Sequence, residues 1–180
     1  MPSDSPLPEL LAHLAAMPAL LRDVAAALAG ATQQRPAAGG FAFVEHAWHL
    51  ADLEREGYGT RISRLMTEVA PVLPDFDGDR IAREREYLHE DAALALQVFA
   101  RTRARNIERL ATLDAAALAR RGTQDGVGEI MLARVPRMMA AHDAGHVAEL
   151  AALVAELAPG APVLARLRAG PGVPGEPSLA

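Results

Sequence analysis

The chain has 180 residues, of which 51% are hydrophobic and only 4% aromatic, and its formal net charge is −5. This length suits one domain with a sizeable core, and the many Ala and Leu residues favour helices. The acidic balance argues against a nucleic-acid partner, because binding phosphates requires clustered Lys and Arg. The chain contains no cysteine, which excludes disulfides, thiolate ligands and a cysteine nucleophile. Any metal must therefore be held by His nitrogen and carboxylate oxygen.

The first helical region is expected over residues 6–29, where Ser5 can cap the helix. Pro18 lacks a backbone donor and predicts a kink or break in the middle. This apolar stretch also contains charged residues and lacks the basic start and cleavage site of a signal peptide. We therefore expect a soluble cytoplasmic protein with no membrane partner.

Three longer helical regions are expected over residues 41–69, 79–113 and 129–157. Segments rich in Pro, Gly and Asp, which favour loops, separate them. Residues 120–128 are expected to form a loop, and no β-strand is predicted. Pro136, six residues before His142, is expected to bend the last helix.

Helices that each have one apolar side bury that side best as a bundle, so the predicted fold class is all-α, a four-helix bundle. Residues 1–158 are expected to form this bundle domain. Residues 159–180 hold repeated Pro and Gly with few large apolar side chains. They predict a loosely packed C-terminal tail.

His142 and His146 lie four residues apart on the last predicted helix, which places both rings on one face. On a helical wheel, Val135, Met138 and Leu153 fall within about 40° of His142, so the pair lies on the inward stripe. Two interpretations are open. The rings are either core histidines bonded to carbonyls or carboxylates, or a pair of metal ligands.

The second predicted helix supplies further candidate ligands. Glu45, His49, Asp52 and Glu56 fall within about 60° of one another on the wheel. Burying this cluster without a cation would be costly, whereas the alternative is an ordinary acidic, solvated helix face. The apolar side of the helix points away from His49, so either His49 lines a wet cleft at the bundle rim or its pairing with His142 and His146 is wrong.

These motifs resemble those of the DinB/YfiT-like superfamily of bacterial four-helix-bundle metalloproteins. Residues 48–54 resemble its HLADxE signature, and residues 139–146 resemble its HDxxH signature. Residues 35–40, with Arg-Pro and Gly-Gly, and residues 73–77, followed by Tyr87, also fit. The resemblance covers about residues 10–157 and implies an up-down-down-up bundle, in which we expect the first helix to be kinked or broken near Pro18.

The resemblance further implies that one divalent metal ion is bound by His49, His142 and His146, with His46 as the alternative ligand from the second helix. Three neutral imidazoles leave a coordination position open, as in catalytic sites. Zinc and nickel both suit imidazole. Asp143 is a candidate for orienting a ligand ring.

The leading functional hypothesis is an enzyme acting on a small molecule, either a metal-dependent hydrolase or a transferase that uses a low-molecular-weight thiol. Glu45, Asp52 and Glu56 are the candidate general bases, and Glu45 and Asp52 could also orient a ligand ring. A non-catalytic metal- or ligand-binding stress-response bundle is the alternative, and a bundle whose histidines bind nothing is the third possibility. Relatives of this type suggest a homodimer by analogy.

Overall fold

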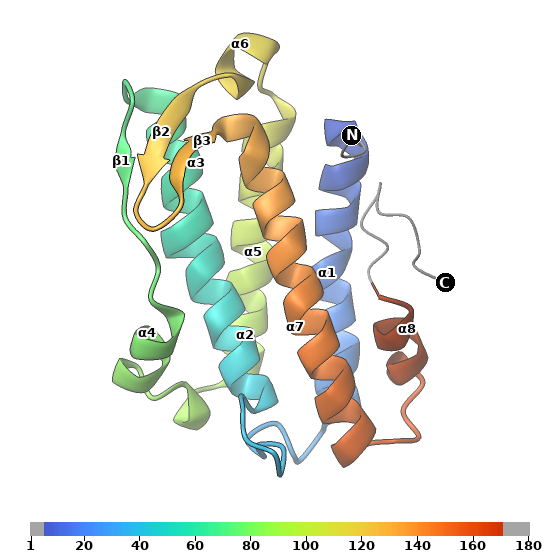
Figure 1. Ribbon diagram of the computed structural model, residues 1–180. Coiled ribbons are helices and arrows are strands. Elements are labelled where there is room, and N and C mark those ends of the chain that lie inside the picture. Colours follow the sequence, from blue (N-terminus) through green and yellow to red (C-terminus); the bar gives the residue numbers. More distant parts are fainter. Residues whose placement is uncertain (1–5, 171–180) are drawn as a thin grey trace.

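The computed structural model describes residues 6–170, and most of them are helical. Four long helical segments lie side by side and form a bundle (Figure 1). They are α1 (Leu7–Ala27), the continuous run of α2 (Phe43–Asp52), π-helix η1 (Leu53–Tyr58) and α3 (Gly59–Thr67), then α5 (Ala92–Ala111) and α7 (Val135–Leu157). In Figure 1, α1 and α7 run in one direction, and α2–α3 and α5 in the other. The predicted all-α, up-down-down-up four-helix bundle is confirmed.

Helix α1 continues through Pro18 without a break. The helix buries Leu10, Leu14, Leu21 and Val24 at helical spacing, and it packs against both α5 and α7. Among the described helices, α1 is the one whose length and composition would also suit a membrane span. The expected break at Pro18 is wrong, a kink there stays a prediction, and Ser5 lies outside the described residues.

A polar layer divides the core of the bundle into two apolar clusters. On α5, Phe99 belongs to one cluster and Leu110 to the other, and the buried Arg103 and Asn106 lie between them. Helix α7 repeats this arrangement: Met139 and Ala140 belong to one cluster and Val147 to the other, with three polar side chains between them, namely His142, Asp143 and His146. The candidate site therefore lies at the level where the apolar core is interrupted.

The predicted helix over 79–113 is not one helix. Helix α4 (Gly78–Glu84) ends where Glu86 adopts a left-handed conformation with φ of 50°. The 3₁₀-helix η2 (Tyr87–His89) follows. Helix α5 begins anew after Asp91, whose carboxylate accepts hydrogen bonds from two backbone amides of its first turn.

The predicted loop over 120–128 contains a β-hairpin instead. Strands β2 (Arg121–Gln124) and β3 (Gly128–Met131) pair antiparallel, and β1 (Val72–Leu73) pairs parallel with β2. The tight turn needs the positive φ angles of Gly126 and Gly128. A short helix α6 (Ala115–Leu118) precedes the hairpin, and the 3₁₀-helix η3 (Leu132–Arg134) follows it. This small sheet caps one end of the bundle (Figure 1).

In the C-terminal part, the expected bend at Pro136 loses its basis and the expected loose tail is wrong in part. Pro136 lies in the first turn of α7, where no backbone donor is needed, so it gives no reason for a bend before His142. Residues of the expected loose tail form α8 (Val163–Ala169), which buries Val163, Leu164 and Leu167 in the core. Residues 171–180 lie outside the described chain, and the domain boundary at residue 158 stays a prediction.

Candidate metal centre

Three imidazoles meet inside the bundle, one from α2 and two from α7. His142 Nε2 lies 3.2 Å from His49 Nε2 and 3.3 Å from His146 Nε2. Each of the three residues offers a ligand atom within 4.8 Å of the others. The four-residue spacing of His142 and His146 brings their rings to one face of α7, and α2 supplies the third ring.

Burial favours the neutral form of all three rings. The pKa of His142 is lowered to about 3 and that of His146 to about 2, first by burial and then by the neighbouring imidazoles. Burial also lowers the pKa of His49. Neutral imidazoles present lone pairs, which is the state that binds a metal.

The donor spacing fits a divalent ion. Two nitrogens that each lie about 2.1 Å from a tetrahedral metal are roughly 3.4 Å apart, close to the 3.2 and 3.3 Å separations of the Nε2 atoms here. A set of three imidazoles suits zinc or nickel and leaves at least one coordination position for another ligand.

The His49 ring is held by packing. Phe41 and Phe76 lie against it, each with its ring centroid 5.9 Å away. The Gly78 backbone is so close that a Cβ there would lie 2.6 Å from His49 Nδ1. This nitrogen is buried and has no hydrogen-bond partner among the described residues. The orientation of His49 therefore depends on shape complementarity at the start of α4.

A second cluster lies on the other side of the His146 ring. His46 Nδ1 is 2.9 Å from His146 Nδ1, and Glu149 Oε2 is 3.3 Å from the same nitrogen. The structure thus brings His49 rather than His46 to His142, and metal binding by His49, His142 and His146 stays a prediction. Sequence reasoning missed Glu149, although its three-residue spacing from His146 places both on one side of α7.

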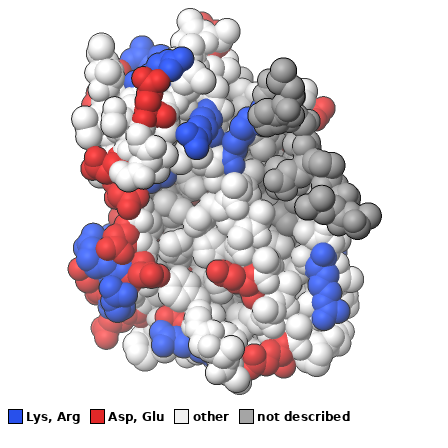
Figure 2. Space-filling model, viewed as in Figure 1, with Lys and Arg blue, Asp and Glu red and all other residues white. Residues whose placement is uncertain are grey.

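A cavity of about 600 Å³ opens beside the histidines and is lined by His49 and His146, among others. Three carboxylates also line it, those of Asp79, Glu149 and Glu156. Among the described residues, no Lys or Arg lines this cavity. The middle of the face over α2 and α7 is largely uncharged apart from an acidic side chain, and basic side chains lie toward its upper and lower ends (Figure 2). A cleft that reaches two of the candidate ligands is what an enzyme needs.

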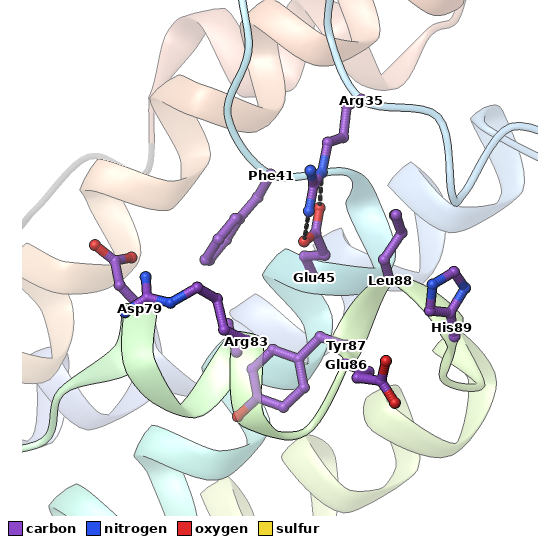
Figure 3. A pocket seen from close by; sticks show the side chains of 10 residues that line it. Arg35, Phe41, Glu45, Asp79, Arg83, Glu86, Tyr87, Leu88 and His89 are labelled. Carbon is purple, nitrogen blue, oxygen red and sulfur yellow. Dashed lines mark hydrogen bonds and ion pairs between the residues drawn. The ribbon is translucent and has the colours of Figure 1, made fainter.

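A smaller cavity of about 260 Å³ adjoins the first, since Phe41 and Asp79 line both. Figure 3 shows the Phe41 ring between the Arg35–Glu45 ion pair on one side and α4, which carries Asp79 and Arg83, on the other. Arg83 thereby places a positive charge in this second cavity, which the first cavity lacks.

The three predicted general bases are bound to arginines. Glu45 accepts hydrogen bonds from Arg35 at 2.8 and 2.5 Å and from the backbone amide of Ala42 at 2.9 Å. Burial alone would raise the pKa of Glu45, but these donors outweigh it and the pKa is lowered. The Glu45 side chain therefore connects the segment before α2, which contains Arg35 and Ala42, to helix α2.

Asp52 and Glu56 share their arginine partners. Arg55 donates to both carboxylates, and so does Arg85. The Tyr87 hydroxyl also donates to Asp52, at 2.5 Å. Neither these two carboxylates nor Glu45 belongs to a cluster of potential metal ligands or lines the larger cavity. Their role as general bases stays a prediction.

Asp143, expected to orient a ligand ring, instead binds Arg103 through two hydrogen bonds of 2.6 and 3.0 Å. Arg103 also lies 2.9 Å from Glu54 Oε2, and Asn106 donates to Glu54 Oε1 at 2.8 Å. All four side chains are buried. The sequence offered no signal for this network, because its members come from η1, α5 and α7.

The fold and the site together define a class, a four-helix bundle with a three-histidine centre between its helices. The sequence profile of the DinB superfamily matches residues 13–150, a span that includes all three histidines. The chain belongs to the DinB superfamily, and the predicted resemblance is confirmed.

Among solved structures, the chain is similar to YfiT from Bacillus subtilis, described as a probable metal-dependent hydrolase with an unusual four-helix bundle topology. The TM-score is 0.77 with 20% sequence identity, over 87% of this chain and 92% of that one. At this identity the likeness shows the fold alone. A search of curated proteins gave no match.

Proposed function

We propose that this chain is a metal-dependent hydrolase that binds one divalent ion, zinc or nickel, through His49, His142 and His146. The observation that carries the proposal is the meeting of three buried or half-buried imidazoles, two of which, His49 and His146, line a cavity of about 600 Å³. The description of YfiT as a probable metal-dependent hydrolase supports it by analogy.

The bound ion would supply Lewis-acid chemistry, polarising a carbonyl oxygen and lowering the pKa of water or of a thiol. The chain itself supplies the walls of the cavity and the proton acceptors. Asp79 and Glu149 line the cavity beside the histidines, so they replace Glu45, Asp52 and Glu56 as our candidates for the group that accepts a proton from water. Phe41 and Leu153 provide the apolar surface for a small-molecule substrate.

A transferase that uses a low-molecular-weight thiol is the alternative chemistry, because the same site would favour a thiolate. We place hydrolysis first because the cavity wall carries carboxylates and, among the described residues, no cation that would bind an anionic thiol. A homodimer and a cytoplasmic location stay predictions.

The first test is the metal content and affinity of the purified wild type and of His49→Ala, His142→Ala and His146→Ala. The matched control is His89→Ala, since His89 is exposed and belongs to neither cluster. We expect about one equivalent of zinc or nickel in the wild type and the control, and its loss in each of the three variants. Wild type that binds no divalent ion after reloading would overturn the proposal.

The second test loads the protein with zinc and screens neutral esters and amides, with small thiols added in a parallel screen. Hydrolysis that depends on the metal supports the proposed activity. Turnover only with a thiol present would favour the transferase. Metal binding without turnover on either panel would leave a non-catalytic metal-binding bundle.

A further inference from the structure

We propose that His46 is a positioning residue for the candidate ligand His146: it accepts a hydrogen bond from His146 Nδ1–H and so keeps the Nε2 lone pair of His146 directed toward the metal position. This inference rests on the proposed metal site and adds a role for a histidine outside the ligand set.

The contact between the two rings requires one proton. The Nδ1 atoms of His46 and His146 are 2.9 Å apart, and both residues are buried, with exposed fractions of 3% and 9%. Two unprotonated nitrogens at this distance would repel each other through their lone pairs, and two protonated ones would clash. One ring must therefore donate and the other accept.

The metal position decides which ring donates. His146 Nε2 faces His142 Nε2 at 3.3 Å, so Nε2 is the atom that His146 presents to an ion. A neutral imidazole that binds a metal through Nε2 carries its proton on Nδ1. His146 is therefore the donor, and His46 accepts with Nδ1 and carries its own proton on Nε2.

The surroundings hold both rings in this arrangement. The planes of His46 and His146 are nearly perpendicular, at 84°, and Phe41 packs edge-on against His46 with a centroid separation of 5.5 Å. Glu149 Oε2 lies 3.3 Å from His146 Nδ1 and 3.6 Å from His46 Nδ1, so its negative charge favours a proton between the two rings and, being slightly nearer to His146, adds only a small preference for that nitrogen. Because the Glu149 side chain is 62% exposed, its attraction is screened, and the buried His46 is the principal partner.

His46, His146 and Glu149 could instead hold a second metal ion. His146 would then bridge two ions through both ring nitrogens and would have to lose its remaining N–H proton. The hydrogen bond accounts for the same short contact with a neutral ring, so we assign one ion to the site and place His46 outside its ligand set.

The test compares zinc affinity, by competition with a chromogenic chelator, in wild type, His46→Leu and His46→Asn, with His89→Asn as control. Asn places an amide oxygen near the position of Nδ1 and keeps an acceptor there, whereas Leu removes it. We expect His46→Leu to weaken zinc binding by about 10- to 100-fold, and His46→Asn and the control to stay near wild type. Far-ultraviolet circular dichroism and thermal unfolding without metal must show that both His46 variants fold.

Long-range ¹H–¹⁵N NMR of the zinc-loaded wild type adds a direct measurement. We expect the proton of His146 on Nδ1 and that of His46 on Nε2. Two equivalents of bound zinc, unchanged affinity in His46→Leu, or a proton of His46 on Nδ1 would each overturn this inference while leaving the three-histidine site intact. Failure of wild type to bind zinc, nickel or any other divalent ion would overturn both the proposed function and this inference.

Discussion

Arg103 on α5 and Asp143 on α7 form a buried, two-pronged ion pair in the layer that also holds the histidines, with Nη1 2.6 Å from Oδ2 and Nη2 3.0 Å from Oδ1. Arg103 further binds Glu54 and donates to the carbonyl oxygen of Leu14 at 3.2 Å. One guanidinium thus connects four parts of the chain. Since Asp143 follows His142 directly, this network fixes the position of α7 along the bundle axis at the candidate metal centre.

Arg103→Leu should destabilise the protein strongly, because it leaves two buried carboxylates without their cation. Removing one partner of a buried ion pair typically costs about 3–5 kcal/mol. Urea unfolding of the metal-free protein measures the loss. Arg166→Gln, which removes the exposed partner of Asp23, is the control and should change stability little. A loss no larger than that of the control would mean that water reaches Asp143 and Glu54 and that the network is not a structural requirement.

Gly78→Ala should reduce metal affinity without unfolding the protein. The added Cβ would press on the His49 ring, which no hydrogen bond to Nδ1 holds in place among the described residues. The ring must turn, and its Nε2 then leaves the position near His142. We expect about a tenfold or greater rise in the zinc dissociation constant, by analogy with the loss of outer-sphere support.

Gly145→Ala is the matched control for this substitution. Gly145 lies on α7 between the two histidines, but nothing lies within 4 Å of the position that a Cβ would take there, and its φ is helical. Ala should stabilise the helix by roughly 0.5–1 kcal/mol and leave metal affinity unchanged. Equal affinity in Gly78→Ala and Gly145→Ala would show that His49 tolerates the added methyl group and that Gly78 has no role in orienting it.

The histidine centre could be predicted from the sequence because its signal is local. The spacing of His142 and His146 and the motif around His49 each lie within one helix, and helical geometry places their rings. The surroundings of the centre depend on contacts between distant segments. Asp52 and Glu56 share a wheel face with His49, but Arg85, about thirty residues further along, pairs with both. No local pattern reveals that partner.

The break between α4 and α5 has a similar cause. The sequence from residue 79 to residue 113 has the composition of one long helix, yet the chain turns at Glu86. The turn lets the Tyr87 hydroxyl reach Asp52 and lets its ring stack on Trp48, with centroids 6.3 Å apart. These tertiary contacts override helix propensity. They also place α4, with Gly78 and Asp79, against the candidate metal centre, which a single straight helix would not do.

Glu45→Gln should destabilise the protein at neutral pH and less so in acid. The folded-state pKa of Glu45 lies below its ordinary value of 4.5, because the hydrogen bonds from Arg35 and Ala42 outweigh the effect of burial. The stabilisation from its charge is therefore fully present above pH 4.5 and is lost as the pH falls through the lowered pKa.

Urea unfolding of wild type and Glu45→Gln at several pH values from 7 to 3 checks this sign. The wild type should be the more stable at pH 7, and the gap should shrink below pH 4.5. A gap that stays constant or widens in acid would mean that the Arg35–Glu45 pair does not depend on the charge of Glu45.

Asp79→Asn should lower metal-dependent hydrolysis while leaving the zinc stoichiometry unchanged. Asp79 lines the cavity beside His49, and the described residues include no hydrogen-bond partner or ion pair for its carboxylate, which leaves it available to accept a proton. Loss of a general base typically costs about 10²- to 10⁴-fold in rate. The measurement is kcat/KM for a neutral ester with zinc-loaded protein, and Glu56→Gln is the comparison, because Glu56 is paired with Arg85 outside this cavity. A large loss of kcat/KM in Glu56→Gln with none in Asp79→Asn would return the role of general base to the second predicted helix. Glu149→Gln would then be tested as well. Its zinc affinity would be measured in parallel, because Glu149 contacts His146.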